Sequence, residues 1–278
     1  MAAETTFSGP VSRKERAPLS RWLIDVVGVA ILLFLCLPIA IVIPMSFSSA
    51  DTLEFPPPGF SLRWFESFFN DPRWLEAAKN SIIVAFASST LAVILGSAAA
   101  YGLVRATFRG TRVLEANFLM PLIVPQVITA LALYIYLAKF GLLGTLPGMI
   151  IGHTVLGLPY VVLLMSVAIR SFDVRIEQAA LSLGASWQLM FWRVLVPNLI
   201  PSMLAAWIFA FIISFDEVII TVFLSGAYDT IPKKMFNELV LRVNPTITAI
   251  ATLLITFTVI TMGLIAWLAK RGGVSMPR

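Results

Sequence analysis

The sequence predicts an all-α integral membrane protein in which six transmembrane helices cross the bilayer and both termini are cytoplasmic. Of its 278 residues, 59% are apolar and 13% are charged, whereas soluble domains average about half apolar and about a quarter charged residues. The apolar residues form six runs of about the 20 residues that a helix needs to cross a bilayer. Helices are expected because each span must satisfy its own backbone polar groups.

These runs define one transmembrane domain between two short tails. The domain organisation is a basic cytoplasmic tail at 1–21, a six-helix domain at 22–269 and a second cytoplasmic tail at 270–278. The predicted spans cover residues 22–47, 81–104, 114–137, 148–169, 199–224 and 247–269.

The first span, 22–47, has an alternative interpretation as a secretory signal peptide. Ser48 and Ala50 would form an acceptable small-residue cleavage site. The apolar run is longer than the core of a signal peptide, however, which has about 7–15 residues. We therefore expect an uncleaved helix, kinked near Pro38 and Pro44.

The segments between the later spans differ in character. Residues 48–79 are polar and rich in aromatic residues, which indicates a loop with a short helix at the level of the lipid headgroups. The third span contains Pro121 and Pro125, and we treat it as one crossing. The loop between the fourth and fifth spans, 170–197, is the longest on its side of the membrane.

Basic residues determine the predicted orientation. The segments on the side of the two termini contain about twice as many Lys and Arg residues as those on the other side, and such segments face the cytoplasm. The net charge of +5 follows from these clusters beside the spans, so it does not indicate a nucleic-acid-binding face. A lone Cys36 and a lone His153 exclude a disulfide framework and a histidine-rich metal site.

The cytoplasmic loop at 170–197 contains the most specific pattern. Asp173 is a plausible N-cap, and Glu177 follows in the first turn, where acidic residues are favoured. Ala180 and Gly184 lie four residues apart, so a helix would present a smooth patch to another surface. Proline residues at 197 and 201 are expected to interrupt the chain before the membrane. On composition alone, an amphipathic helix on the membrane surface explains this loop equally well.

The spacing favours a different interpretation. The loop resembles the EAA loop of ATP-binding-cassette (ABC) importer permeases, E-A-A-x-x-x-G followed by an apolar-x-apolar-Pro ending. Ala179 and Ala180 match the alanine pair, Gly184 the glycine, and Pro197 the end of VLVP. The family glutamate then falls on Gln178, while Glu177 lies one residue earlier, about 100° around the helix. The resemblance covers most of the chain, and GHTVLGLPYVVLLMSVAIRSFDVRIEQAALSLGAS is especially similar to the second permease of spermidine/putrescine importers.

This resemblance implies the type I ABC importer permease fold and a set of partners. The implied partners are an ATPase subunit dimer, a second homologous permease, a periplasmic substrate-binding protein and a small-molecule solute, all at the bacterial inner membrane. The residues implied to contact the ATPase are Glu177, Gln178, Ala179, Ala180, Gly184 and Pro197. The chain has no G-x-x-x-x-G-K-[ST] run for phosphate binding. We therefore expect a transport subunit that is not an enzyme and binds no cofactor, with ATP and Mg on the partner ATPase.

Two adjacent acids in the fifth span are the first candidates for the substrate pathway. Asp216 and Glu217 lie ~25 Å along a helix that starts near Leu199. Carboxylates at such depth are costly and usually face a bundle interior or a wet cavity. The alternative is that one acid pairs with Lys139 or Lys233 at the outer rim. On a continuous helix, Glu217 would occupy the more polar face, so it faces the pathway more convincingly than Asp216.

Further pathway candidates surround the acids. The polyamine permeases carry a paired acid at this point, so the resemblance favours a role for both. The residues Trp207, Phe211 and Phe215 recur every four positions and either form a cation–π wall for an amine or pack against another helix. Gln126, after Pro125, is an additional candidate, whereas we expect His153 to form interhelical hydrogen bonds.

The predicted function is ATP-driven import of polyamines (putrescine or spermidine) or related cationic amines. Similar permeases import opines, aminophosphonates or ferric iron, and the sequence leaves these substrates open. A secondary transporter would instead use Asp216, Glu217 and His153 as a proton route. A membrane-embedded enzyme would need catalytic groups on facing helices, and the two acids have no convincing partners of that kind.

Overall fold

The computed structural model describes residues 18–106, 109–241 and 244–271, with side chains from residue 22 to residue 260. The chain forms two compact units, one from Met1–Phe65 with Pro245–Arg278 and one from Glu66–Asn244. Over the described ranges the regular structure is helical, as predicted, apart from an isolated bridge between Ser48 and Phe60. The predicted tails lie largely outside the described residues.

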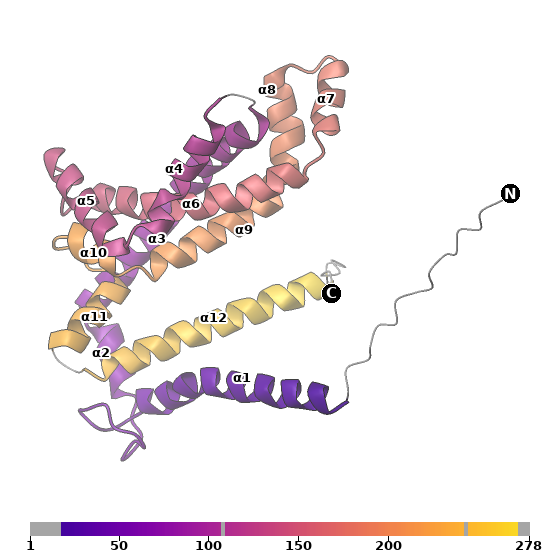
Figure 1. Ribbon diagram of the computed structural model, residues 1–278. Coiled ribbons are helices and arrows are strands. Elements are labelled where there is room, and N and C mark those ends of the chain that lie inside the picture. The colour runs from indigo at the N-terminus through magenta and orange to yellow at the C-terminus, as the bar shows by residue number, and fades with distance from the viewer. Residues whose placement is uncertain (1–17, 107–108, 242–243, 272–278) are drawn as a thin grey trace. The chain divides into compact units, whose positions relative to one another are not determined.

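The first unit pairs two long apolar helices. The helices α1 (Pro18–Ser46) and α12 (Thr246–Arg271) pack against each other (Figure 1). Side chains along α1 are largely exposed, Phe34 by 74%, as expected for a helix that meets lipid. The segment after α1 leads to the predicted short helix, α2 (Arg63–Asn70). Trp64 Nε1 donates to the Ser48 carbonyl at 3.0 Å and so fixes this connection.

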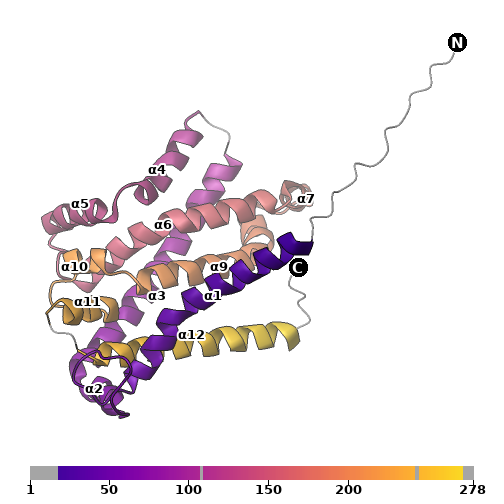
Figure 2. The same cartoon turned by 60° about the horizontal axis from the view of Figure 1, so that its bottom comes forward.

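The second unit is built on three tightly packed helices. The helices α3 (Pro72–Arg105), α6 (Leu146–Ser171) and α9 (Val196–Phe215) contact one another along their lengths (Figure 2). Small residues allow this approach, as is common between membrane helices. A Cβ atom at Gly96 would lie 2.7 Å from Val161 Cγ1, and one at Gly157 would lie 3.6 Å from both Ala92 and Ala210.

Among the described residues, four helices are long and apolar enough to cross a membrane, and a bent pair brings the total to five. The bent pair is α4 (Thr111–Ile123) and α5 (Gln126–Lys139), which meet at 106°. The predicted third span, 114–137, therefore corresponds to two helices with a sharp bend between them. Pro125 lacks an amide hydrogen and holds Val124 in extended backbone (ψ 132°), so the helix cannot continue.

The predicted fifth span also differs from the observed helix at both ends. The helix α9 ends at Phe215, and α10 (Ile219–Leu224) begins after a three-residue break. At the other end α9 continues without interruption from α8 (Trp187–Met190) and a π-helical turn, η1 (Phe191–Leu195). The expected interruption at Pro197 and Pro201 is thus absent. The wider π turn spares Pro197 the clash that a regular α-helix would impose.

The last predicted span, 247–269, corresponds to α12. The part of α12 whose side chains are described, Thr246–Ile260, is apolar but shorter than a membrane span. A sixth crossing stays a prediction. The helix α11 (Ile231–Leu241) follows α10 in the sequence and precedes α12. The start of α11 is fixed to α3, because Ile231 N donates to Ser81 Oγ at 2.8 Å.

Candidate functional site

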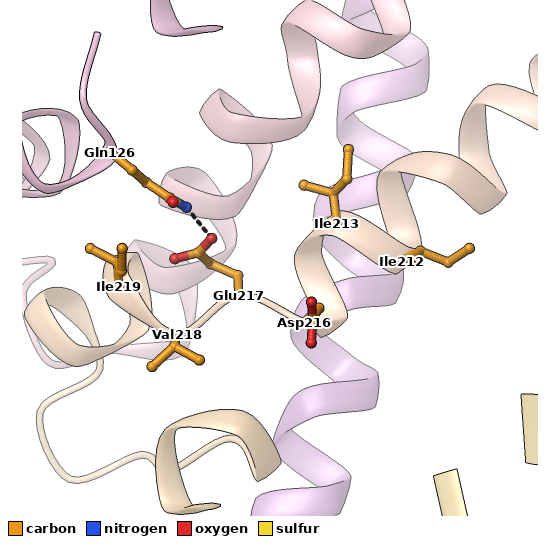
Figure 3. Close-up of a pocket in the computed structure, with 7 residues that line it drawn as sticks. All are labelled: Gln126, Ile212, Ile213, Asp216, Glu217, Val218 and Ile219. Atoms are coloured by element: carbon orange, nitrogen blue, oxygen red, sulfur yellow. Dashed lines mark hydrogen bonds between the residues drawn. The ribbon is translucent and has the colours of Figure 1, made fainter. Parts of the chain in front are cut away.

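Two helix breaks meet inside the second unit. One is the bend at Pro125, directly after which Gln126 opens α5. The other separates α9 from α10 and contains both predicted acids, Asp216 and Glu217. The Gln126 side-chain amide donates to Glu217 Oε2 across the gap (Figure 3). The structure thus brings together three residues that the sequence placed in the pathway.

Glu217 is buried, with 6% of its surface exposed, and both of its carboxylate oxygens are occupied. Oε2 accepts from Gln126, and Oε1 accepts from Ile220 N at 2.8 Å in the first turn of α10. A carboxylate is favoured at a helix N-terminus, where backbone N–H groups lack helical partners. The predicted alternative of pairing with Lys233 or Lys139 was wrong for Glu217. Lys233 pairs with Asp229 at 2.9 Å instead, and Lys139 is exposed.

Asp216 is exposed, and its carboxylate points away from Gln126 and Glu217 (Figure 3). Within the described ranges it has neither a hydrogen-bond nor an ion-pair partner. The expectation that Glu217 faces the pathway more convincingly than Asp216 was based on a continuous helix, and the break removes that basis, although Glu217 does line both cavities at this point. Of the two carboxylates, the one on Asp216 is therefore the one without protein partners in the described ranges.

Glu217 lines two neighbouring cavities, and Asp216 lines the larger of them. One, of about 380 Å³, is lined by Gln126, Ile212, Ile213, Asp216, Glu217, Val218 and Ile219. The other, of about 260 Å³, shares Gln126, Ile213 and Glu217 and adds polar groups from Thr129 and Tyr160. These volumes are near the lower end of the range for small-molecule sites, about 300–1,000 Å³. The Gln126–Glu217 pair stands at the boundary between the two cavities.

The three aromatic residues considered as a cation–π wall, Trp207, Phe211 and Phe215, lie away from the two cavities. The Trp207 ring contacts Phe86 edge-on at 5.4 Å, and Trp207 Nε1 donates to Thr90 Oγ1 at 3.0 Å, both on α3. Phe211 stacks on Trp207 at 5.4 Å and Phe215 on Phe211 at 5.8 Å. None of the three rings lines either cavity at the acids. The structure therefore gives this stripe the helix-packing role, one of the two roles that the sequence left open for it.

A buried polar chain crosses the same region. His153 on α6 is 1% exposed, and it contacts Ser214 Oγ through Nδ1 at 2.8 Å and Thr221 Oγ1 through Nε2 at 3.0 Å. Ser88 Oγ donates to Ser214 Oγ at 2.9 Å, and Thr221 Oγ1 donates to the Glu217 carbonyl at 3.1 Å. All four hydrogen bonds can form at the same time if His153 is neutral with its proton on Nε2. Nε2 then donates to Thr221 Oγ1, and Nδ1 accepts from the Ser214 hydroxyl. His153 forms interhelical hydrogen bonds, as expected, and joins α9 to α10 across the break.

Replacing His153 with Leu is expected to destabilise the protein. Ser214 and Thr221 would lose a buried partner, and an unsatisfied buried polar group costs about 1–3 kcal/mol. Thermal unfolding in detergent measures the effect. Thr90→Val is the matched control, because it removes the half-buried bond to Trp207 on the same helix bundle. An equal or larger loss of stability in the control would contradict a special role for the His153 chain.

The loop at 170–197, here called the coupling segment, forms a helical hairpin from α7 (Val174–Ser182), α8 and η1. Asp173 caps α7 by accepting from Arg175 N at 2.9 Å, as predicted. The helix α7 ends because Gly184 adopts φ +88°, a left-handed conformation that favours glycine. Ala185 N donates back to the Ala180 carbonyl at 3.1 Å. The predicted smooth patch of Ala180 and Gly184 on one helix was therefore wrong, because Gly184 lies beyond its end.

The residues of the coupling segment that were predicted to contact the ATPase differ in their exposure. Glu177 is buried and forms an ion pair with Arg105 at 2.7 Å. Ala180 is half-buried, and the exposed members are Gln178, Ala179, Gly184 and Pro197. Large apolar side chains lie exposed beside them, Leu183 by 89% and Trp192 by 67%.

Residues 92–272 match the family model described as "Binding-protein-dependent transport system inner membrane component". The chain belongs to this family. It is 31% identical, over 81% of its own length and 88% of the relative, to the spermidine/putrescine transport system permease protein PotC of Haemophilus influenzae. It is 33% identical, over 84% of its length and 85% of the relative, to the putrescine transport system permease protein PotI of Escherichia coli.

Solved structures support the family fold. The chain matches a bacterial ABC transporter involved in the import of the acidic polysaccharide alginate, with a TM-score of 0.74 at 19% identity over 93% of this chain and 99% of the other. A second match, with a TM-score of 0.66 at 15% identity over 93% of this chain and 96% of the other, is an alginate transporter in complex with a periplasmic protein bound to an alginate pentasaccharide. The chain is thus a multi-pass membrane component of a binding-protein-dependent transporter.

Several residues of this transport component were not identified from the sequence. Ser88, Ser214 and Thr221 extend the contacts of His153, but a hydroxyl group in an apolar run carries no signal of its partner. Tyr101 and Arg105 contact Glu177 from more than 70 positions away. The apolar run that ends at Arg105 predicted the end of a span and gave no indication of an ion pair.

Proposed function

We propose that this chain is the permease subunit of an ATP-driven importer that moves polyamines, such as putrescine or spermidine, or related cationic amines into the cytoplasm. The observation that carries this proposal is the cavity at the two helix breaks, where two acids and Gln126 line an otherwise apolar site. The relatives whose names specify spermidine and putrescine support the choice of substrate.

The chemistry of the cavity suits a cation. Asp216 offers an exposed carboxylate, and Glu217 adds a second acid whose oxygens are already occupied by Gln126 and Ile220. An ammonium group can pair with Asp216, whereas the carboxylate of an opine or the phosphonate of an aminophosphonate would be repelled by both acids. Tyr160 in the neighbouring cavity supplies an aromatic ring that can contact a cationic group.

The proposed assembly follows the family. Six spans with both termini in the cytoplasm, tails at 1–21 and 270–278, and a bacterial inner-membrane location would place the coupling segment against an ATPase dimer. Leu183, which is 89% exposed next to Gly184, would supply an apolar contact to that partner. A second homologous permease and a periplasmic binding protein complete the complex. The ATPase binds ATP and Mg, and this chain binds no cofactor.

Transport by the copurified complex in liposomes tests the proposal. The solutes are putrescine, spermidine, an opine, an aminophosphonate and ferric iron, each with its binding protein. We expect ATP-dependent amine uptake that falls about tenfold in Asp216→Asn, which corresponds to the loss of ~1.4 kcal/mol. The control is Glu76→Gln, which neutralises an exposed acid on α3 outside the cavities.

The other outcomes are equally informative. Uptake of an anion or of iron, unaffected by Asp216→Asn, would overturn the amine assignment but leave the permease assignment intact. Uptake by the chain alone, without an ATPase, would instead favour a secondary transporter.

A further inference from the structure

The last two turns of α3 carry two side chains that hold the coupling segment. Tyr101 and Arg105 are four residues apart and therefore project from the same face of α3. Both contact Glu177 of α7, although α3 is connected to the coupling segment in the sequence only through α4, α5 and α6.

Arg105 makes the stronger of the two contacts. Its Nη2 lies 2.7 Å from Glu177 Oε1, and its Nε donates to the same oxygen at 2.9 Å. The same Nη2 donates to the Phe172 carbonyl at 3.0 Å, at the C-cap of α6. The side chains of Arg105 and Glu177 are only 20% and 7% exposed. This ion pair therefore joins the ends of α3 and α6 to the start of the coupling segment.

Tyr101 contacts both arms of the hairpin. Its hydroxyl donates to Glu177 Oε2 at 3.3 Å, so that α3 binds both carboxylate oxygens of Glu177. Its ring lies edge-on to Trp187 of α8 at 6.4 Å and to Phe191 of η1 at 5.8 Å. Tyr101 thus links α7 to α8 and η1 as well as to α3.

The opposite end of α3 is bound to a different part of the chain. Asn80 Nδ2 donates to the Asp229 carbonyl at 3.0 Å, Ser81 Oγ accepts from Ile231 N, and Lys234 Nζ lies 4.8 Å above the Trp74 ring. The 34 residues of α3 span ~50 Å. Figure 1 shows α7 and α8 at one end of this unit and α11 at the other. One helix therefore connects the coupling segment to the segment that leads into α11.

We propose that Arg105 and Tyr101 are positioning residues that couple ATP hydrolysis to transport. They hold the coupling segment to α3 through Glu177, so that a displacement of the segment by the ATPase moves α3 and, through it, the start of α11. This inference rests on the proposed function, which supplies the ATPase as the partner of the segment. In this chain Glu177 thus forms an ion pair within the chain and is not part of the surface that the segment presents to the ATPase.

The test measures putrescine uptake per ATP hydrolysed in liposomes that hold the complete complex with its binding protein. The variants are Arg105→Gln, which removes the ion pair, Arg105→Lys, which keeps the charge but loses the second donor, and Tyr101→Phe, which removes only the hydroxyl. Glu115→Gln is the matched control, because it breaks the exposed pair to Arg170 (3.4 Å), in which Glu115 is 38% exposed. Copurification of the ATPase and the second permease reports assembly separately.

We expect Arg105→Gln to reduce uptake per ATP by at least about fivefold, with assembly and hydrolysis retained. A fivefold change is at the lower end of the effects that coupling between two sites usually has. Arg105→Lys should fall between this variant and the wild type, and Tyr101→Phe should lose less than Arg105→Gln. If Arg105→Gln does not assemble, Arg105→Lys decides the question. A wild-type ratio in every Arg105 variant that assembles, or an equal loss in Glu115→Gln, would overturn the inference.

The two proposals fail in different ways. A wild-type chain that copurifies with no ATPase, or that shows no ATP-dependent uptake, would refute the proposed function. A wild-type complex that transports amine normally, together with unchanged ratios in the variants, would refute only the role of Arg105 and Tyr101.

Discussion

Replacing Glu217 with Leu is expected to destabilise the protein and abolish transport, whereas Glu217→Gln should retain the fold. The leucine side chain would leave the Gln126 amide and Ile220 N without their acceptor at a buried position. Each unsatisfied donor costs about 1–3 kcal/mol, so the combined loss should be at least ~2 kcal/mol. Glutamine keeps an oxygen for the Ile220 amide hydrogen and fits the same space. Thermal unfolding in detergent and amine uptake in liposomes measure the two effects.

Asp216 provides the matched comparison for this prediction. Asp216→Leu changes an adjacent, exposed acid, so its stability should stay within about 0.5 kcal/mol of the wild type. Its uptake should nevertheless fall. An equal loss of stability in the two leucine variants would show that the bonds to Gln126 and Ile220 do not distinguish Glu217, and the assigned division of roles would be wrong.

The second large effect is expected from Gly184→Asp in the coupling segment. A Cβ at Gly184 meets no atom of this chain within 4 Å, so an aspartate would add some backbone strain but no clash within the chain, and it would project bulk and charge towards a docked ATPase. Uptake should fall more than about thirtyfold, as when ~2 kcal/mol is lost at the centre of an interface. ATP hydrolysis should become independent of the solute. Parallel measurements of uptake and hydrolysis report this uncoupling.

Two substitutions at the same position separate charge from backbone strain. Gly184 has φ +88°, a conformation that Asn tolerates better than Ala. Gly184→Asn adds the same bulk without the charge and should lose less transport than Gly184→Asp. Gly184→Ala adds strain with little bulk. Normal transport in Gly184→Asp would refute the assignment of this surface as the docking face.

The sequence was sufficient to predict the apolar helices but not their breaks. The apolar runs at 81–104 and 148–169 lie within α3 and α6, because lipid-facing helices need long apolar stretches. The run around Asp216 and Glu217 contains neither Pro nor Gly at its break, so it indicated a continuous helix. The break is stabilised by partners that no local pattern reveals, Gln126 on α5 and His153 on α6.

The candidate site was predictable as a list of residues but not as an arrangement. Burial cost correctly indicated that the acids face a cavity, yet it could not decide which acid is free, since that depends on where α10 begins. In the coupling segment, Gln178 occupies the position of the family glutamate, and the acid Glu177 lies one residue earlier. This shift indicated that Glu177 makes a different contact from the family glutamate. The identity of its partner, Arg105, depends on how α3 packs and could not be read from the segment itself.

The close approach of α3, α6 and α9 limits how this unit can move. With Gly96 against Val161, and Gly157 in van der Waals range of Ala92 and Ala210, one helix cannot slide past another without a steric clash. We therefore expect the three helices to move together as one block. Backbone rotation would then concentrate at the two helix breaks, Pro125 and residues 216–218, beside the acids that line the cavity.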